Sequence, residues 1–109
     1  MPHIVSLSEL KKKLAGEPAP RLVEALPVRY FQEGHLPSAS HMPHDQIAEL
    51  APAALPDRSA DIIIYCASAT CQNSHKAAAA LERLGYSNVS VFAGGKQEWV
   101  EAGLPLERA

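Results

Sequence analysis

The residues best suited to covalent chemistry in this chain of 109 residues are two cysteines in one short segment. Cys66 directly follows the strongly apolar run Ile62–Tyr65, and Cys71 lies five positions later. The side chains between them are small or polar, so backbone N–H groups can approach a sulfur closely. A helix predicted to begin near residue 73 adds the positive partial charge of its N-terminus. Both effects favour thiolate over thiol, so we expect an exposed, anionic nucleophile at Cys66.

The loop around these cysteines is the expected binding site for a substrate anion. Its members are Ala67, Ser68, Ala69, Thr70, Gln72, Asn73 and Ser74. Position and loop composition also allow another interpretation, in which Cys66 is a small buried hydrophobic residue at the end of a core strand.

Helices are predicted from their end signals. The first begins at Ser6, which fits a capping box with Glu9, and the second spans residues 73–85 with its N-cap at the first or second of these positions. A third is predicted from about 96 to 102. Each of the three is ended by a glycine. A weaker helical stretch covers residues 44–50.

Short apolar runs of strand character alternate with these helices. They cover residues 22–25, Ile62–Tyr65 and Val89–Phe92. The middle run is apolar throughout, which is typical of a central parallel strand covered on both faces. The sequence therefore predicts one α/β domain over residues 1–109, with a small central parallel sheet flanked by helices on both faces. Sites in such sheets lie beyond the carboxyl ends of the strands, where Cys66 is placed.

Composition excludes several classes of protein. With 47% hydrophobic and 20% charged residues the chain is ordinary globular protein, and its net charge of −2 gives no basic surface for nucleic acid. Its apolar runs are far shorter than the roughly 20 residues of a spanning helix, so we expect no membrane partner. The first residues lack the pattern of a secretory signal, and we expect a cytoplasmic protein. Two cysteines cannot form a disulfide framework.

Three segments in order resemble the rhodanese-like sulfurtransferases. Tyr65-Cys66, a tight loop and then residues 74–78 resemble the active-site segment of that family. Residues 34–43, which begin Gly-His-Leu-Pro-Ser-Ala, resemble its Gly-His-Ile-Pro-Gly-Ala block. Residues 93–105 resemble its Gly-Gly, Trp and Ala-Gly-Leu-Pro ending. Together the blocks span roughly residues 22–106, and their order makes the resemblance specific.

The resemblance implies sulfur transfer through a persulfide on Cys66. The thiolate would take the outer sulfur of a donor, either thiosulfate or a persulfide, and pass it to a thiol or cyanide acceptor. Loop N–H groups would stabilise the persulfide anion. The implied partners are a small sulfur donor or a persulfidated protein, together with a thiol acceptor, and neither a metal nor an organic cofactor is expected.

The chain departs from the family pattern in its charges. Where most members have Asp-Val-Arg, this sequence has Glu24, Ala25 and Leu26, so the acid is kept and the arginine is lost. The cysteine loop is about two residues longer than the usual form and lacks its glycine and arginine. No Lys or Arg lies between Cys66 and Ser74. A doubly negative donor such as thiosulfate is therefore no better suited to this loop than a persulfidated protein or small thiol.

Cys71 is an addition to the common loop, and three roles compete for it. It could resolve a Cys66 persulfide by releasing sulfide and forming a disulfide, act as an alternative nucleophile nearer the helix, or be a bystander. We expect Cys66 to carry the sulfur and Cys71 to assist, because Cys66 directly follows the strand.

The histidines favour structural roles. His35, His41 and His44 have spacings reminiscent of a metal site, but a structural zinc usually needs four ligands from paired positions. We expect the His35 ring to bind a neighbouring carbonyl or Glu24 and to support the loop structurally. Trp99 is expected in the core.

Two other functions compete with sulfur transfer. A cysteine phosphatase or arsenate reductase needs an arginine six positions after the cysteine, and residue 72 is glutamine, so this chemistry is disfavoured. The remaining alternative is a catalytically weak or inactive binding or redox-sensor module that uses the Cys66/Cys71 pair.

Overall fold

The computed structural model describes residues 2–108. The strands in this range are β1 (His3–Val5), β2 (Arg21–Glu24), β3 (Ser40–His41), β4 (Ile62–Tyr65) and β5 (Val89–Phe92). The helices are α1 (Leu7–Ala15), α2 (Val28–Glu33), α3 (Ile47–Ala54), α4 (Asn73–Arg83) and α5 (Gly95–Glu101), with a 3₁₀ turn, η1 (His44–Gln46), before α3. Among these described helices, none has the length and apolar character needed to cross a bilayer.

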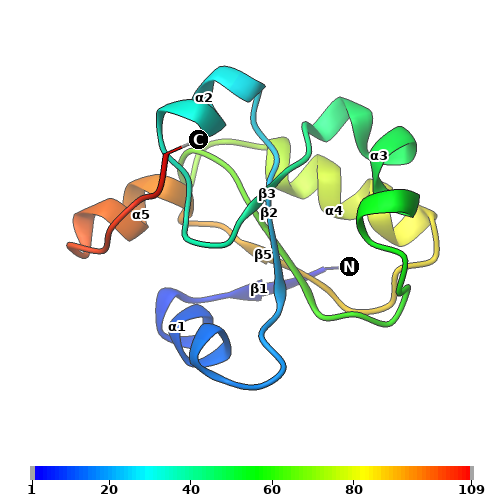
Figure 1. The fold of residues 1–109 in the computed structure, drawn as a ribbon, viewed down its shortest axis with the longest axis horizontal. Helices are drawn as coiled ribbons and strands as arrows, with labels where there is room; N and C mark the ends of the chain where they lie inside the picture. The colour runs from blue at the N-terminus through cyan, green and yellow to red at the C-terminus, as the bar shows by residue number, and fades with distance from the viewer. Residues whose placement is uncertain (1, 109) are drawn as a thin grey trace.

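The strands form one parallel sheet in the order β1-β5-β4-β2-β3 (Figure 1). β4 is central, with Ile64 opposite Val23 of β2 and Val91 of β5. Helices α3 and α4 pack on one face, and α1 and α5 pack on the other. This arrangement confirms the predicted α/β class with helices on both faces.

Alternating side chains of β4 build the two halves of the core. Ile62 and Ile64 pack with α3 and α4, while Ile63 and Tyr65 pack with α1, α5 and Trp99. All four β4 side chains are fully buried. A strand covered on both faces needs an unbroken apolar run, and this is why β4 is recognisable in the sequence.

The predicted ends of several elements agree with the structure. The capping box of Ser6 and Glu9 is formed, and β4 and β5 have the predicted bounds. The predicted N-cap of α4 is wrong by one residue, because Gln72 precedes a helix that starts at Asn73. The stretch predicted over 44–50 begins as η1 and continues as α3 through Pro52 to Ala54.

Three short elements escaped prediction. β1 and β3 are edge strands of three and two residues, and α2 has six residues with none buried. Such short segments carry too few residues to show a hydrophobic period. The two strands form because β1 pairs with β5, and β3 with β2.

Candidate active site

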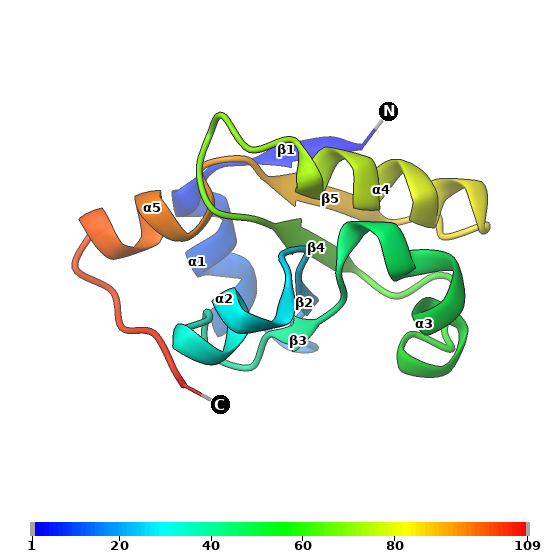
Figure 2. The ribbon, with the colours of Figure 1, turned by 90° about the horizontal axis from the view of Figure 1, so that it is seen from above.

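The segment from Cys66 to Gln72 connects the carboxyl end of β4 to α4. In Figure 2 this loop arcs away from the sheet before α4 begins. The expected position of Cys66, directly beyond the central strand, is therefore observed.

Cys66 itself is enclosed. Its side chain is only 1% exposed, and its Sγ lies 3.4 Å from the C=O of Cys71 and 3.3 Å from Ser74 Oγ. Burial raises the pKa of the Cys66 thiol, and the adjacent Cys71 side chain raises it further, against the lowering effect of hydrogen bonds from Ser74. The resting group is thus a protonated thiol. The expectation of an exposed thiolate at Cys66 is wrong, because the long loop folds back and places the Cys71 backbone against the sulfur.

Cys71 is partly exposed and has the environment that was expected for Cys66. Partial burial opposes its ionisation, but several contacts outweigh that effect and lower its pKa. These contacts are a hydrogen bond from the Cys66 thiol, N–H groups of Ala67 and Asn73, and the charge of Lys76. Cys71 is therefore both the more acidic and the more accessible of the two free thiols.

The other predicted loop residues divide by exposure. Cys71 N–H donates to the Ser68 C=O at 3.0 Å, and the Ser68 and Thr70 hydroxyls lie 3.1 Å apart, so these residues form a tight turn. Ser74 is buried against Cys66. Ala67, Ala69, Thr70 and Gln72 are exposed, and Ser68 and Asn73 are partly exposed.

The N-terminus of α5 holds the loop in place. Lys96 N–H donates to the Cys66 C=O, and Gln97 N–H donates to the Ala67 C=O, both at 2.9 Å. Gly95 has a φ of 64°, and a Cβ there would lie 2.4 Å from the Cys66 carbonyl oxygen. A glycine is required because no side chain fits between α5 and the loop. The sequence alone did not indicate this close approach.

Glu24 belongs to a buried polar network beneath the site. The carboxylate is fully buried, and Tyr65 O–H donates to its Oε1 at 2.7 Å. Lys96 Nζ lies 3.1 Å from Oε2 and donates to the Tyr30 C=O at 2.7 Å. Leu36 N–H donates to the Tyr65 oxygen, which links the network to the segment after Gly34. Sequence reasoning missed Lys96, whose only signal was a lysine just after the glycine pair.

The histidines near this edge bind backbone groups. His35 Nδ1 lies 2.9 Å from the Phe31 C=O, and its ring stacks on Phe31 at 3.9 Å. Of the two expected partners, it therefore contacts a carbonyl rather than Glu24. His41 Nε2 lies 2.6 Å from the Leu26 C=O. Among residues 2–108, no three His, Cys, Asp or Glu side chains gather as metal ligands would.

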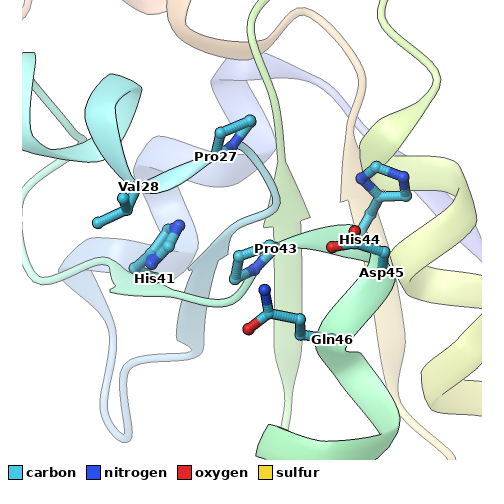
Figure 3. A pocket seen from close by; sticks show the side chains of 7 residues that line it. All are labelled: Pro27, Val28, His41, Pro43, His44, Asp45 and Gln46. Carbon is cyan, nitrogen blue, oxygen red and sulfur yellow. The ribbon is translucent and has the colours of Figure 1, made fainter.

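Two surface pockets lie near the carboxyl edge. The one in Figure 3, of about 460 Å³, lies between the start of α2 and η1, and neither cysteine lines it. Its walls are Pro27, Val28, His41, Pro43, His44, Asp45 and Gln46. The other, of about 510 Å³, includes Ala69 of the cysteine loop and residues of the Gly94–α5 segment, among them Glu98 and Glu101. The two carboxylates make the pocket beside the cysteine loop unfavourable for a dianion.

The fold and the site together define an α/β domain with a parallel sheet and two cysteine thiols at the carboxyl edge of that sheet. The family model of the rhodanese-like domain matches residues 6–102. The chain therefore belongs to the rhodanese-like family, as the three sequence blocks indicated.

Similar proteins occur alone and within larger chains. The chain is 33% identical over 98 residues to an HTH-type transcriptional regulator of Mycobacterium tuberculosis, covering 90% of this chain and 41% of the regulator. The solved rhodanese-like domain of an Anabaena protein is 28% identical, with a TM-score of 0.87, over 100% of this chain and 81% of that one. Thiosulfate sulfurtransferase from Pseudomonas aeruginosa has a TM-score of 0.85 at 24% identity, covering 97% of this chain and 20% of that one, which shows a shared fold.

Proposed function

We propose that this domain is a sulfurtransferase that carries sulfane sulfur as a persulfide on the Cys66–Cys71 loop. The observation that supports it is a partly exposed thiol at Cys71, with backbone N–H groups around its sulfur, beside a second thiol at Cys66. Membership of the rhodanese-like family supports the same chemistry.

The reaction has two halves. A loop thiolate attacks the outer sulfur of a donor R–S–S⁻, which leaves R–S⁻ and a protein persulfide. A thiol or cyanide acceptor then attacks the outer sulfur and restores the thiolate. The N–H groups of Ala67 and Asn73 and the hydroxyl of Ser74 are placed to stabilise negative sulfur in this loop. Both cysteines must start as free thiols, so a reducing compartment such as the cytoplasm suits this chemistry.

The charges around the loop favour a persulfide over thiosulfate as the donor. No Lys or Arg lies between Cys66 and Ser74, and Glu98 and Glu101 border the neighbouring pocket. Lys76 is the cation that acts on Cys71. A single cation and backbone dipoles suit a singly charged donor, either a small persulfide or a persulfidated protein.

Intact-mass spectrometry of the protein, which detects an added sulfur, and an assay of thiocyanate together test the proposal. Reduced protein is mixed with glutathione persulfide or with thiosulfate, and a second sample also receives cyanide as acceptor. We expect thiocyanate to form repeatedly, faster with the persulfide donor, and no reaction from a protein with both Cys66 and Cys71 changed to serine. Failure of the wild-type protein to form thiocyanate from either donor above the rate of the double variant would contradict the proposed function.

The similarity to a transcriptional regulator supports a second candidate, a sulfur- or redox-sensing module. The chain spans 41% of that regulator, which has room for a further domain. A sensor would be modified once per molecule without turnover. The thiocyanate assay separates the two, because a sensor yields at most one product per protein molecule.

A further inference from the structure

The Cys66 thiol lies against the backbone of Cys71, and the two thiols of the loop differ in access. Cys66 is 1% exposed and enclosed by Cys71 and Ser74, whereas Cys71 is partly exposed. A donor arriving from solvent meets Cys71 first. Backbone N–H groups of Ala67 and Asn73 lower the pKa of Cys71, while the Cys66 thiol lies in donor contact with the Cys71 C=O and the Ser74 hydroxyl. The difference in exposure therefore favours Cys71 as the thiol that reacts first with a sulfur donor.

The packing of the Cys66 thiol against Cys71 determines the fate of a persulfide on Cys71. In that persulfide the inner sulfur is Cys71 Sγ, and the Cys66 thiol lies on the buried side of the same residue, 3.4 Å from the Cys71 C=O in the resting loop. The outer sulfur extends from Cys71, the thiol that reaches solvent. Displacement at sulfur is in line, so the attacking and leaving groups lie on opposite sides of the sulfur attacked. Cys66 on the inner side and the outer sulfur on the solvent side fit this requirement at Cys71 Sγ.

We propose that Cys71 takes the sulfur first and that Cys66 then displaces it as hydrosulfide, closing a Cys66–Cys71 disulfide. This inference rests on the proposed function, since it needs the persulfide to form. It assigns Cys66 as the resolving thiol, the reverse of the roles expected from the sequence, and it gives the domain a second outcome besides transfer to an acceptor.

The step balances as Cys71–S–S⁻ + Cys66–SH → Cys71–S–S–Cys66 + HS⁻. The new bond uses an electron pair of Cys66 Sγ, and the outer sulfur leaves with the pair of the bond it shared with Cys71 Sγ. The Cys66 proton departs with the hydrosulfide. An external dithiol then reduces the disulfide by thiol–disulfide exchange and restores both thiols.

The protonated state of Cys66 sets the competition between the two outcomes. Burial raises the pKa of Cys66, so its thiolate is scarce at neutral pH and resolution is slow. An acceptor thiol in solvent can therefore take the sulfur first when it is abundant. Without an acceptor, the loop releases hydrosulfide and forms the Cys66–Cys71 disulfide. The disulfide therefore forms when a sulfur donor is present and an acceptor thiol is absent.

The test is a stoichiometric reaction of reduced protein with glutathione persulfide, with no acceptor present. Wild type, Cys66→Ser, Cys66→Ala and Cys71→Ser are compared by intact mass, by peptide mapping and by hydrosulfide release. Circular dichroism confirms that each variant is folded, and the alanine variant keeps the test valid should a buried serine hydroxyl disturb the loop.

We expect wild type to release hydrosulfide and to become lighter by two hydrogens, with Cys66 and Cys71 in one crosslinked peptide that a dithiol separates. Both Cys66 variants should keep one added sulfur on Cys71 and release at least about tenfold less hydrosulfide. Cys71→Ser should take up sulfur about tenfold more slowly than wild type.

The possible failures are distinct. A wild-type protein that neither gains sulfur nor releases hydrosulfide contradicts the proposed function itself. A wild-type protein that keeps a stable persulfide, or Cys66 variants that release hydrosulfide as fast as wild type, overturns only the resolving role of Cys66. Uptake by Cys71→Ser at the wild-type rate overturns the entry of sulfur at Cys71.

Discussion

At the residue scale, the two cysteines have the same side chain and opposite properties. Burial and the neighbouring Cys71 side chain raise the pKa of Cys66. The Cys66 side chain, backbone N–H groups of the loop and the charge of Lys76 lower the pKa of Cys71. The two thiols therefore differ in pKa before any substrate binds.

A pH titration of alkylation measures this difference in pKa. Because the pKa of Cys71 is lowered, its thiolate is present below the pH range of an ordinary cysteine, and iodoacetamide should label it there. Cys66 should stay unlabelled until more alkaline pH, since its pKa is raised and it is buried. Peptide mass spectrometry of samples quenched at each pH gives both curves. Equal labelling of the two cysteines across the range would contradict the assignment.

Lys76 provides a charge-specific check on Cys71. Its positive charge lowers the pKa of Cys71, so Lys76→Gln should move the labelling midpoint of Cys71 to higher pH. Lys76→Arg keeps the charge and is the matched control. Because Lys76 is exposed and screened by salt, the shift should shrink at high ionic strength. An identical midpoint in wild type and Lys76→Gln at low salt would exclude this electrostatic role.

At the scale of elements, α5 positions the cysteine loop through backbone contacts. Two N–H groups at its start bind carbonyls of Cys66 and Ala67, and Gly95 allows the approach. The loop conformation therefore depends on a helix that comes much later in the chain, after α4 and β5.

Gly95→Ala tests this dependence. The new methyl would collide with the Cys66 carbonyl, and the alanine would have to keep the positive φ of the glycine. We therefore expect a loss of about 1–3 kcal/mol in unfolding free energy and a greater proportional loss of sulfur uptake. Gly103→Ala is the matched control, because φ is 79° there but nothing lies within 4 Å of the added Cβ. Urea unfolding and the persulfide mass assay are run on both. Similar uptake by the two variants would show that the loop tolerates displacement.

At the scale of the whole molecule, the buried network of Glu24, Tyr65 and Lys96 joins β2, β4 and α5 beneath the site. It lies between the sheet and the segments that carry the loop. A buried charge pair of this kind holds the elements in one arrangement only while both partners are present.

Removal of one charge should be costly. Glu24→Gln leaves Lys96 facing a neutral amide, and we expect a loss of about 3 kcal/mol in unfolding free energy, at the lower end for buried pairs because the Lys96 side chain is 16% exposed and also binds the Tyr30 C=O. The double variant Glu24→Gln with Lys96→Met should recover part of the loss. Chemical denaturation of the single and double variants gives the coupling. Additive losses would show that the two side chains act independently.

The sequence by itself determined the elements with strong local patterns. β4 is a continuous apolar run, α1 begins with the capping box of Ser6 and Glu9, and Cys66 follows β4 directly. Order along the chain and side-chain period are local properties, so these features and the α/β class could be predicted. The same holds for the three blocks that indicated the rhodanese-like family.

Only the tertiary structure decided which thiol is accessible and which cation pairs with the buried carboxylate of Glu24. Exposure and pKa depend on groups that lie far apart in sequence, and no local period encodes those distances. The Cys66 thiol is closed in by the backbone of its own long loop, and the cation that pairs with Glu24 is Lys96, from the opposite end of the chain. The edge strands β1 and β3 likewise exist only through pairing with distant partners.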